Sequence, residues 1–282
     1  MRGITVGVVK ASKSQKFPVG SHAIGSVGWT EIAVVKDTQL ERADIPSNGK
    51  LTDFLGVLGE EFSLLILKSG KQNDQALLTT ISGLTGLTAY FGILDVGKVE
   101  AGDFVVVSGA AGATGSVVGQ IAKLKGAKVL GIAGTDEKCQ WLTNELGFDA
   151  ALNYKDKDFG KKFRAATKQL IDVFFDNVGG EILDMALSRA KPHARFVICG
   201  GISQYNNAEQ KGPKNYLMIV SMRIRMQGFI VFDYAKQYPQ ARAQLARWLE
   251  EGKIKRQETI IKGGLAHAEQ GLVDLYNGIN TG

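Results

Sequence analysis

Short, almost wholly apolar runs alternate with segments of helical period between residues 104 and 198. Runs without a polar face predict strands that are buried on both sides, and such strands belong to parallel sheets covered by helices. Right-handed crossovers between the strands then give a doubly wound α/β sheet. The predicted strands are 104–107, 128–133, 150–152, 172–175 and 195–198, and the predicted helices are 117–125, 137–146, 161–168 and 181–189.

The regions before and after this stretch differ from it in composition and in hydrophobic pattern. Residues 1–59 are rich in glycine and β-branched residues, notably in 4–9 and 19–35, and predict short strands in a twisted antiparallel sheet or partial barrel. Residues 263–282 hold one further pattern of helical period. A chain of 282 residues is long enough for one large domain or two medium ones.

Composition excludes several classes of protein. Hydrophobic residues make up 44% of the chain and charged residues 22%, which argues against a disordered chain, and no long apolar window predicts a membrane span. Only two cysteines, Cys139 and Cys199, and no signal-peptide pattern favour a reducing, cytoplasmic location. The net charge is +6, but the most cationic cluster, 155–164, interleaves acids and is typical of a solvated helix face. We therefore expect neither nucleic acid nor a membrane as a partner.

A glycine-rich segment, 108–116, follows the first predicted strand and precedes a predicted helix. Gly112 lets the backbone approach a diphosphate, Gly115 lets the helix pack on the strand, and the free N–H groups of the helix start face the anion. The strand before the segment and the second strand after it make a dinucleotide site the favoured interpretation. The alternative is a glycine-rich turn with a structural role only.

The end of the second strand indicates which dinucleotide binds. An NAD enzyme places an acid there to hold the ribose hydroxyls, whereas this chain has Ala133, Gly134 and Thr135, followed by Lys138. A small opening beside a cation suits the 2′-phosphate of NADP. Asp136 is a counter-candidate, but it stands at the expected helix start, where an acid also serves as a cap.

Two classes of oxidoreductase are disfavoured. The short-chain dehydrogenases need Tyr and Lys four residues apart on a helix, and none of the seven tyrosines has a lysine at that spacing. Zinc alcohol dehydrogenases need thiolate and imidazole ligands, but His22, His193 and His267 are scattered and only two cysteines are present. We expect no metal in the reaction.

Several motifs occur in an order that resembles one family. They are 86–92, 108–123, 136–138, 153–155, 175–180, 198–206 and 249–254. Together they resemble the zinc-independent medium-chain dehydrogenase/reductases, close to the prostaglandin reductase and leukotriene 12-hydroxydehydrogenase group of NADPH-dependent alkenal/one reductases. The resemblance covers most of the chain.

This resemblance implies a domain plan. Residues 1–83 would form a GroES-like β-barrel catalytic domain, 84–261 the NADP-binding domain, and 262–282 a return to the catalytic domain. Against the family pattern, the opening strands and the final strand are expected to be missing. About residues 60–82 the chain carries extra sequence, which we interpret as a surface insertion or non-native translated sequence without a catalytic role.

The resemblance also implies site residues. The loop Gly112–Gly115, which includes Ala113 and Thr114, would meet the diphosphate, and Lys138 and Tyr154 would hold the 2′-phosphate. The nicotinamide half would be lined by Asn177, Cys199, Gly200, Gly201, Ile202, Ser203, Tyr205, Phe229, Ile230, Val231 and Asn280. Simpler interpretations remain for three of these positions: Tyr154 could cover a strand end, Asn177 could belong to a turn, and Tyr205 could be an ordinary loop aromatic.

The implied reaction is the NADPH-dependent reduction of the carbon–carbon double bond of an α,β-unsaturated aldehyde or ketone. Hydride would go to the β-carbon, and Tyr205 would donate a hydrogen bond to the oxygen that gains negative charge, with a cofactor ribose hydroxyl able to share the task. Two alternatives are an NADPH:quinone oxidoreductase and an inactive NADPH-binding pseudoenzyme. The resemblance also allows a homodimer.

Overall fold

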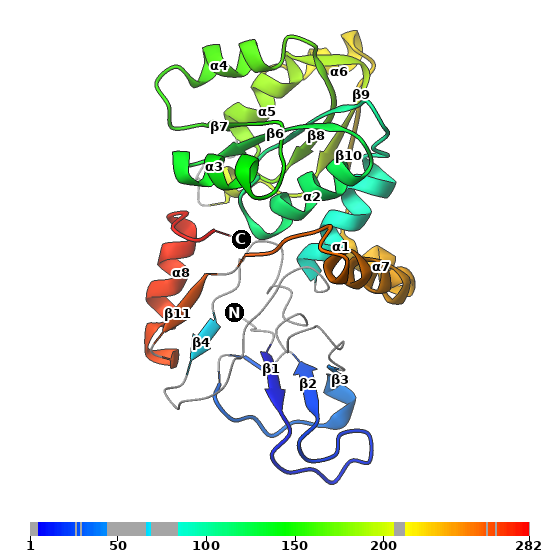
Figure 1. The fold of residues 1–282 in the computed structure, drawn as a ribbon, viewed down its shortest axis with the longest axis vertical. Helices are drawn as coiled ribbons and strands as arrows, with labels where there is room; N and C mark the ends of the chain where they lie inside the picture. Colours follow the sequence, from blue (N-terminus) through cyan, green and yellow to red (C-terminus); the bar gives the residue numbers. More distant parts are fainter. Residues whose placement is uncertain are drawn as a thin grey trace. The chain divides into compact units, whose positions relative to one another are not determined.

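The computed structural model describes residues 5–25, 27–28, 30–43, 66–68, 84–205, 212–257, 259–262 and 264–281. The chain divides into two compact units, which are considered separately (Figure 1). Unit 1 comprises Met1–Gly86 with Arg256–Gly282, and unit 2 comprises Leu87–Lys255. Among the described helices, none is long and apolar enough to cross a membrane.

Unit 2 is built on six parallel strands in the order β10-β9-β8-β5-β6-β7 (Figure 1). Numbered along the chain, this is the order 6-5-4-1-2-3 of a dinucleotide-binding Rossmann fold. The predicted doubly wound α/β sheet is confirmed. The strands are β5 (Phe104–Val107), β6 (Lys128–Ala133), β7 (Ala150–Asn153), β8 (Ile171–Asp176), β9 (Ala190–Ile198) and β10 (Arg225–Gly228).

Helices cover both faces of this sheet. On one face, side chains of α4, α5 and α6 pack in a single core with Val106, Leu130, Phe174 and Phe196. On the other face, a Cβ at Gly131 would lie 2.9 Å from Leu142 of α3, so glycine allows close packing there. The helical segments are α1 (Leu84–Phe91), η4 (Gly92–Val96), α2 (Ala113–Leu124), α3 (Asp136–Asn144), α4 (Phe159–Ala166), α5 (Gly180–Leu187), η5 (Ile202–Gln204), α6 (Leu217–Ser221), η6 (Val231–Gln237) and α7 (Tyr238–Glu250).

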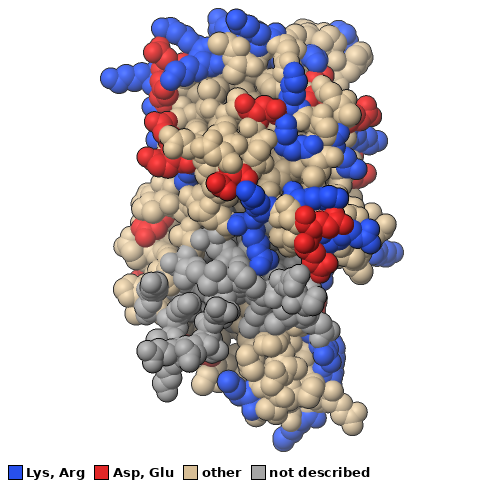
Figure 2. All heavy atoms as spheres, viewed as in Figure 1, with Lys and Arg blue, Asp and Glu red and all other residues tan. Residues whose placement is uncertain are grey.

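The cationic cluster 155–164 forms the approach to α4 and most of that helix. Figure 2 shows Lys and Arg side chains interspersed with Asp and Glu over the end of unit 2 that carries α4. Lys161 pairs with Asp158 at 3.0 Å, and Lys162 pairs with Asp156. The structure therefore places acids and cations of this cluster in mutual contact.

Some boundaries differ from the predicted ones. Helix α2 begins at Ala113 rather than residue 117, because its first turn is made of small residues that carry no apolar period. Strand β9 begins at Ala190 rather than residue 195; its polar first half is joined to β8 through a register shift that apolar patterning does not reveal. Strand β10 was not predicted, because an edge strand can be polar.

The first strands of unit 1 form an antiparallel sheet in the order β1-β2-β3, in line with the predicted antiparallel pairing. The expected strand region 19–35 is too long, since residues 30–36 are not in a strand and Ile32 and Val34 are 84% and 100% exposed. Apart from β4, the proposed insertion 60–82 lies outside the described residues. The elements are β1 (Thr5–Val8), β2 (His22–Gly25), η1 (Asp37–Gln39), β3 (Leu40–Arg42), β4 (Ile66–Lys68), which runs parallel to β11 (Ile260–Lys262), then η7 (Gly264–His267) and α8 (Ala268–Tyr276).

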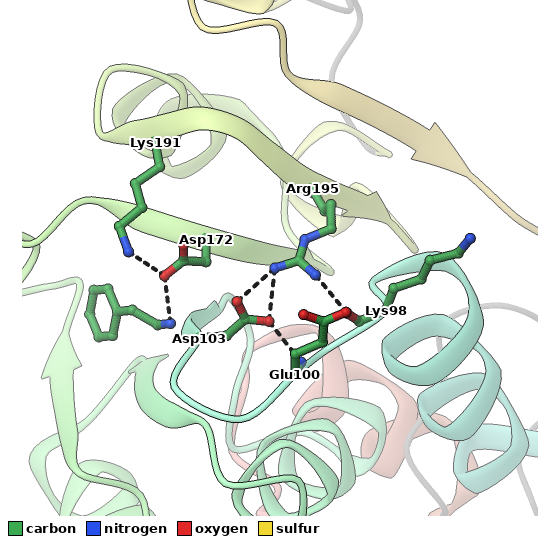
Figure 3. A network of polar contacts seen from close by, with 7 residues as sticks. Lys98, Glu100, Asp103, Asp172, Lys191 and Arg195 are labelled. Atoms are coloured by element: carbon green, nitrogen blue, oxygen red, sulfur yellow. Dashed lines mark hydrogen bonds and ion pairs between the residues drawn. The ribbon is translucent and has the colours of Figure 1, made fainter.

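A network of ion pairs holds the amino ends of the central strands of unit 2 together (Figure 3). Arg195 on β9 donates to both carboxylate oxygens of Asp103, each at 2.8 Å. Asp172 on β8 accepts from the backbone N–H of Phe104 at 2.8 Å and from Lys191 at 2.6 Å. These bonds fasten the start of β5 to its neighbours, at the edge of the sheet opposite the glycine-rich segment.

Candidate cofactor site

The carboxyl ends of β5 and β8 lie side by side at the point where the strand order of the sheet reverses. From here the chain winds to β6 on one side and to β9 on the other. In open α/β sheets, ligands bind in the crevice outside the carboxyl ends of the strands at such a switch point. Ser108 directly follows β5 and Asp176 ends β8, and both are fully buried.

The glycine-rich segment has the geometry of an anion cradle. Gly112 is the N-cap of α2, with an extended backbone and no capping side chain, so the N–H groups of the first turn have no partner within the helix. A Cβ at Gly115 would lie 2.8 Å from the Cα of Ala110 and would overlap the carbonyl of Gly109. Gly112–Gly115 therefore fit a diphosphate at the positive end of a helix dipole, and this contact stays a prediction.

A second anion-binding feature lies at the ends of β6 and β7. A Cβ at Gly134 would lie 3.1 Å from the ring of Tyr154, so the exposed phenol lies against bare backbone. Lys138 is half-buried in the first turn of α3, and burial, followed by the charge of Lys155, lowers its pKa. Lys155 also lies over the Tyr154 ring, 5.9 Å from its centroid. An added phosphate would favour the charged form of Lys138, so the group fits a phosphorylated ribose.

Lys155 was missed at this site by sequence reasoning. The only signal was its position next to Tyr154, because its approach to Lys138 depends on how β6 and β7 pair. With Lys155, the candidate phosphate site holds two cationic side chains, Lys138 and Lys155, rather than one.

The structure corrects the expectation for Asp136. The N-cap of α3 is Thr135, whose hydroxyl accepts from the N–H of Lys138 at 3.2 Å. Asp136 is instead the first helical residue, and its carboxylate accepts from the side-chain amide of Asn153 at 2.9 Å. This contact turns the acid toward β7.

Asn177 is hydrogen-bonded to Ser108, the residue that follows β5. Its N–H donates to the hydroxyl of Ser108 at 2.9 Å, and its side-chain amide donates to the Ser108 carbonyl at 2.7 Å. These bonds place Asn177 at the switch point. The carbonyl oxygen of its side chain takes no part in either bond.

The loop 199–205 lies against the turn that follows β8. The N–H groups of Cys199 and Gly200 donate to the carbonyl of Asp176, at 2.9 and 3.1 Å. Further bonds run from Ile202 N to Asn177 O (3.3 Å), from Ser203 N to Val178 O (3.1 Å) and from Ser203 Oγ to Val178 O (2.6 Å). The structure therefore brings together Asn177 and the segment Cys199–Tyr205, and their contact with the nicotinamide half of the cofactor stays a prediction.

Tyr205 folds back over this loop. Its phenol oxygen accepts a hydrogen bond from the N–H of Gly201 at 2.9 Å, while its side chain remains 44% exposed. The phenol hydrogen is not used in that bond and can be donated elsewhere. A hydroxyl that accepts a hydrogen bond becomes a stronger donor.

The remaining predicted residues are dispersed. The ring of Phe229 comes within 2.7 Å of the Cβ position at Gly92, and Val231 is buried, so both side chains pack within unit 2 while Ile230 is exposed. Asn280 lies in unit 1, after α8. Of the three residues on unit 2, Ile230 is exposed, Phe229 is partly buried and Val231 is buried.

An aromatic cluster, not predicted as part of the site, holds η6 to α1. Phe91 stacks on Tyr234 with ring centroids 4.3 Å apart, and Tyr234 donates to Asp95 at 2.6 Å. Burial first, and then this carboxylate, raises the pKa of Tyr234 to about 12. Tyr234 therefore keeps its proton at neutral pH.

Comparison with known proteins decides the family. A model for the family described as "Zinc-binding dehydrogenase" matches residues 113–248. "Putative NADP-dependent oxidoreductase YfmJ" of Bacillus subtilis is 41% identical, over 99% of this chain and 76% of its own length. "Prostaglandin reductase 1" of Bos taurus is 37% identical, over 100% of this chain and 79% of its own. The solved structure of CurA from Vibrio vulnificus in complex with NADPH has a TM-score of 0.85 and 35% identity, covering 100% of this chain and 78% of that one.

The chain belongs to the zinc-independent medium-chain dehydrogenase/reductases. This family membership confirms the expected NADP-dependent oxidoreductase and its NADP cofactor.

The matching family model is named for zinc binding, but the described part of this dehydrogenase/reductase has no group of side chains that could bind zinc. There, no three His, Cys, Asp or Glu side chains gather closely enough to hold a metal ion. Burial raises the pKa of Cys139 to about 11, so this thiol is protonated at neutral pH. The absence of a metal from the reaction stays a prediction.

Proposed function

We propose that this dehydrogenase/reductase uses NADPH to reduce the carbon–carbon double bond of α,β-unsaturated aldehydes or ketones. The observation that carries the proposal is the placement of Tyr205, an exposed phenol with a donatable hydrogen, on the loop that is bonded to the switch point. Relatives named for such substrates support it, among them "2-alkenal reductase (NADP(+)-dependent)" of Nicotiana tabacum at 35% identity and "NADPH-dependent curcumin reductase" of Escherichia coli at 34%.

The cofactor half of the site would be used as follows. The backbone N–H groups of Gly112–Gly115 would bind the diphosphate, and Lys138, Tyr154 and Lys155 would bind the 2′-phosphate. Asn177 and the loop 199–205 would position the nicotinamide end, as would the chain around Ile230.

In the reaction, NADPH supplies a hydride to the β-carbon of the conjugated carbonyl compound. The electron pair of the double bond moves toward the carbonyl, and Tyr205 donates a hydrogen bond to the oxygen as its negative charge grows. A proton then reaches the α-carbon, which gives the saturated aldehyde or ketone and NADP⁺. The protein thus contributes orientation and hydrogen bonding, and conjugation makes the β-carbon electrophilic without a metal.

An assay of NADPH oxidation against matched acceptors tests this proposal. The panel holds a medium-length 2-alkenal, the saturated aldehyde of the same length, a simple enone and a simple quinone. We expect turnover with the enal and enone, saturated carbonyl products, and no turnover with the saturated aldehyde. Turnover of the quinone alone would favour the quinone oxidoreductase, and saturable NADPH binding without any turnover would favour the pseudoenzyme.

We also propose that the protein forms a homodimer. Within the described residues β10 pairs on one side only, with β9, and the nearby Tyr216, Leu217 and Val220 are exposed apolar side chains. An unpaired edge and an apolar patch are features of association surfaces. Sedimentation of the parent and of Leu217→Glu tests this, since a monomeric parent would contradict it.

A further inference from the structure

Asp176 has an unusual environment for an acid. Its side chain is fully buried, and its Oδ1 accepts from the hydroxyl of Ser108 at 2.7 Å and from the N–H groups of Val178 and Gly179, each at 3.0 Å. Its Oδ2 is also buried and has no hydrogen-bond partner among the described residues. Burial raises the pKa of this carboxyl, and the three hydrogen bonds offset that effect only in part.

The bonds made by Asp176 join three segments of the candidate site. Through Ser108 the carboxyl reaches the end of β5, and through the N–H groups of Val178 and Gly179 it shapes the turn after β8. Its main-chain carbonyl accepts from both Cys199 and Gly200 at the start of the loop that carries Tyr205. The Ser108 hydroxyl also accepts from the N–H of Asn177, so one connected network spans the switch point.

Asp172 lies at the opposite end of β8 and serves as a comparison, because its role is structural. It also bonds to β5, through the N–H of Phe104 at 2.8 Å, but it is partly exposed and paired with Lys191 (Figure 3). Asp176 has a similar link to β5, yet its carboxyl is buried with one oxygen unpaired. A buried polar group with an unpaired atom lowers the stability of the fold. Proteins retain such groups at sites where they hold functional residues in a required geometry.

We propose that Asp176 is a positioning residue for the hydride transfer: it fixes Asn177 and the loop 199–205 against the end of β5, and so sets where the nicotinamide of NADPH and the Tyr205 hydroxyl meet. The inference rests on the proposed function. Because hydride transfer is sensitive to small misplacement of the reacting atoms, a loosened network slows the reaction more than it weakens binding of the distant adenine end.

The test compares Asp176→Ala and Asp176→Asn with the matched control Asp172→Ala. For each protein we would measure the unfolding temperature, the Kd values of NADPH and of 2′,5′-ADP, the fluorescence of bound NADPH, and kcat and KM for an enal. The ligand 2′,5′-ADP reports on the adenine and 2′-phosphate end alone.

For Asp176→Ala we expect unchanged affinity for 2′,5′-ADP, weaker binding and altered fluorescence of NADPH, and a kcat that falls by roughly tenfold to a hundredfold. Asp176→Asn keeps an oxygen that can accept the three bonds, so it should restore most of kcat. Asp172→Ala should lower the unfolding temperature and leave kcat unchanged.

The inference is overturned if Asp176→Ala weakens both ligands equally, or if it only lowers the unfolding temperature and leaves kcat as in the parent. It is also overturned if Asp172→Ala lowers kcat by as much. Should Asp176→Ala fail to fold, Ser108→Ala is measured in its place with the same expected split. If the parent turns over no acceptor, the proposed function fails by itself, and the comparison of NADPH with 2′,5′-ADP still decides the role of Asp176.

Discussion

The phenol oxygen of Tyr205 accepts a hydrogen bond from the N–H of Gly201, four residues earlier, at 2.9 Å. This bond fixes the oxygen over its own loop, where a Cβ at Gly200 would come within 3.2 Å of it. The lack of side chains at Gly200 and Gly201 lets the hydroxyl come this close to the loop backbone. A fixed hydroxyl with a free hydrogen is the kind of group that stabilises a developing negative charge.

Tyr205→Phe should lower kcat for an enal by roughly tenfold to a hundredfold, because one hydrogen bond to the developing charge is lost and a cofactor hydroxyl can still donate. The Kd of NADPH should change little. Tyr276→Phe is a suitable control, since Tyr276 is an exposed tyrosine at the end of α8 in unit 1. Equal kcat values for Tyr205→Phe and the parent would remove Tyr205 from the mechanism.

Lys138→Ala should weaken NADPH binding by about 1.5–3 kcal/mol, because a charge-assisted contact to the phosphate is lost. The affinity for NADH should be unaffected. Lys155→Ala should act in the same direction but less strongly, because Lys155 is exposed to solvent. Titrations of both reduced coenzymes measure the effect, with Lys128→Ala, at the far end of β6, as control. A parent protein that binds NADPH and NADH equally would contradict the 2′-phosphate site.

Asp176→Asn should become more stable relative to the parent as pH rises. Burial raises the pKa of the Asp176 carboxyl in the folded protein above its value in the unfolded chain. Between these two pKa values the unfolded chain binds fewer protons, so the stability of the parent falls as pH increases through that window. Unfolding temperatures of both proteins from about pH 4 upward measure this. A difference that stays constant with pH would show that the carboxyl is not perturbed.

Gly115→Ala should destabilise the protein by roughly 1–3 kcal/mol and weaken NADPH binding, because its Cβ would collide with the backbone of Gly109 and Ala110. The matched control is Gly160→Ala, also in a helix, where a Cβ would meet nothing within 4 Å. That variant should be neutral or more stable by about 0.5–1 kcal/mol. Chemical unfolding and NADPH titration check both, and a tolerated Gly115→Ala would argue against a tight cradle.

Local sequence patterns predicted the centre of the fold well. Strands β5 and β6 and the glycine-rich segment between them are each marked within a few residues, by apolar runs and by the small residues of the turn. The confirmed family resemblance rests on this stretch and on further motifs between residues 86 and 254. By contrast, polar β10 carries no apolar period, and its place at the edge of the sheet depends on the packing of the rest.

The site was predictable only in part, for a related reason. Lys138 and Tyr154 stand in motifs that imply a phosphate contact. Lys155 is part of the same motif as Tyr154, but its approach to Lys138 follows only from the pairing of β6 and β7. Similarly, the sequence pattern marks Asp176 only as the polar residue at the end of a strand. Its bond to Ser108 links residues 68 positions apart, and no local pattern reports such a contact.

The absence of a side chain at Gly134 has a consequence for the proposed 2′-phosphate site. A methyl group there would lie 3.1 Å from the ring of Tyr154, so this exposed side chain would have to shift by a few tenths of an ångström to make room for it. An exchange of Lys138 for an acid would therefore leave the Tyr154 ring where it is, whereas a side chain at position 134 would displace it.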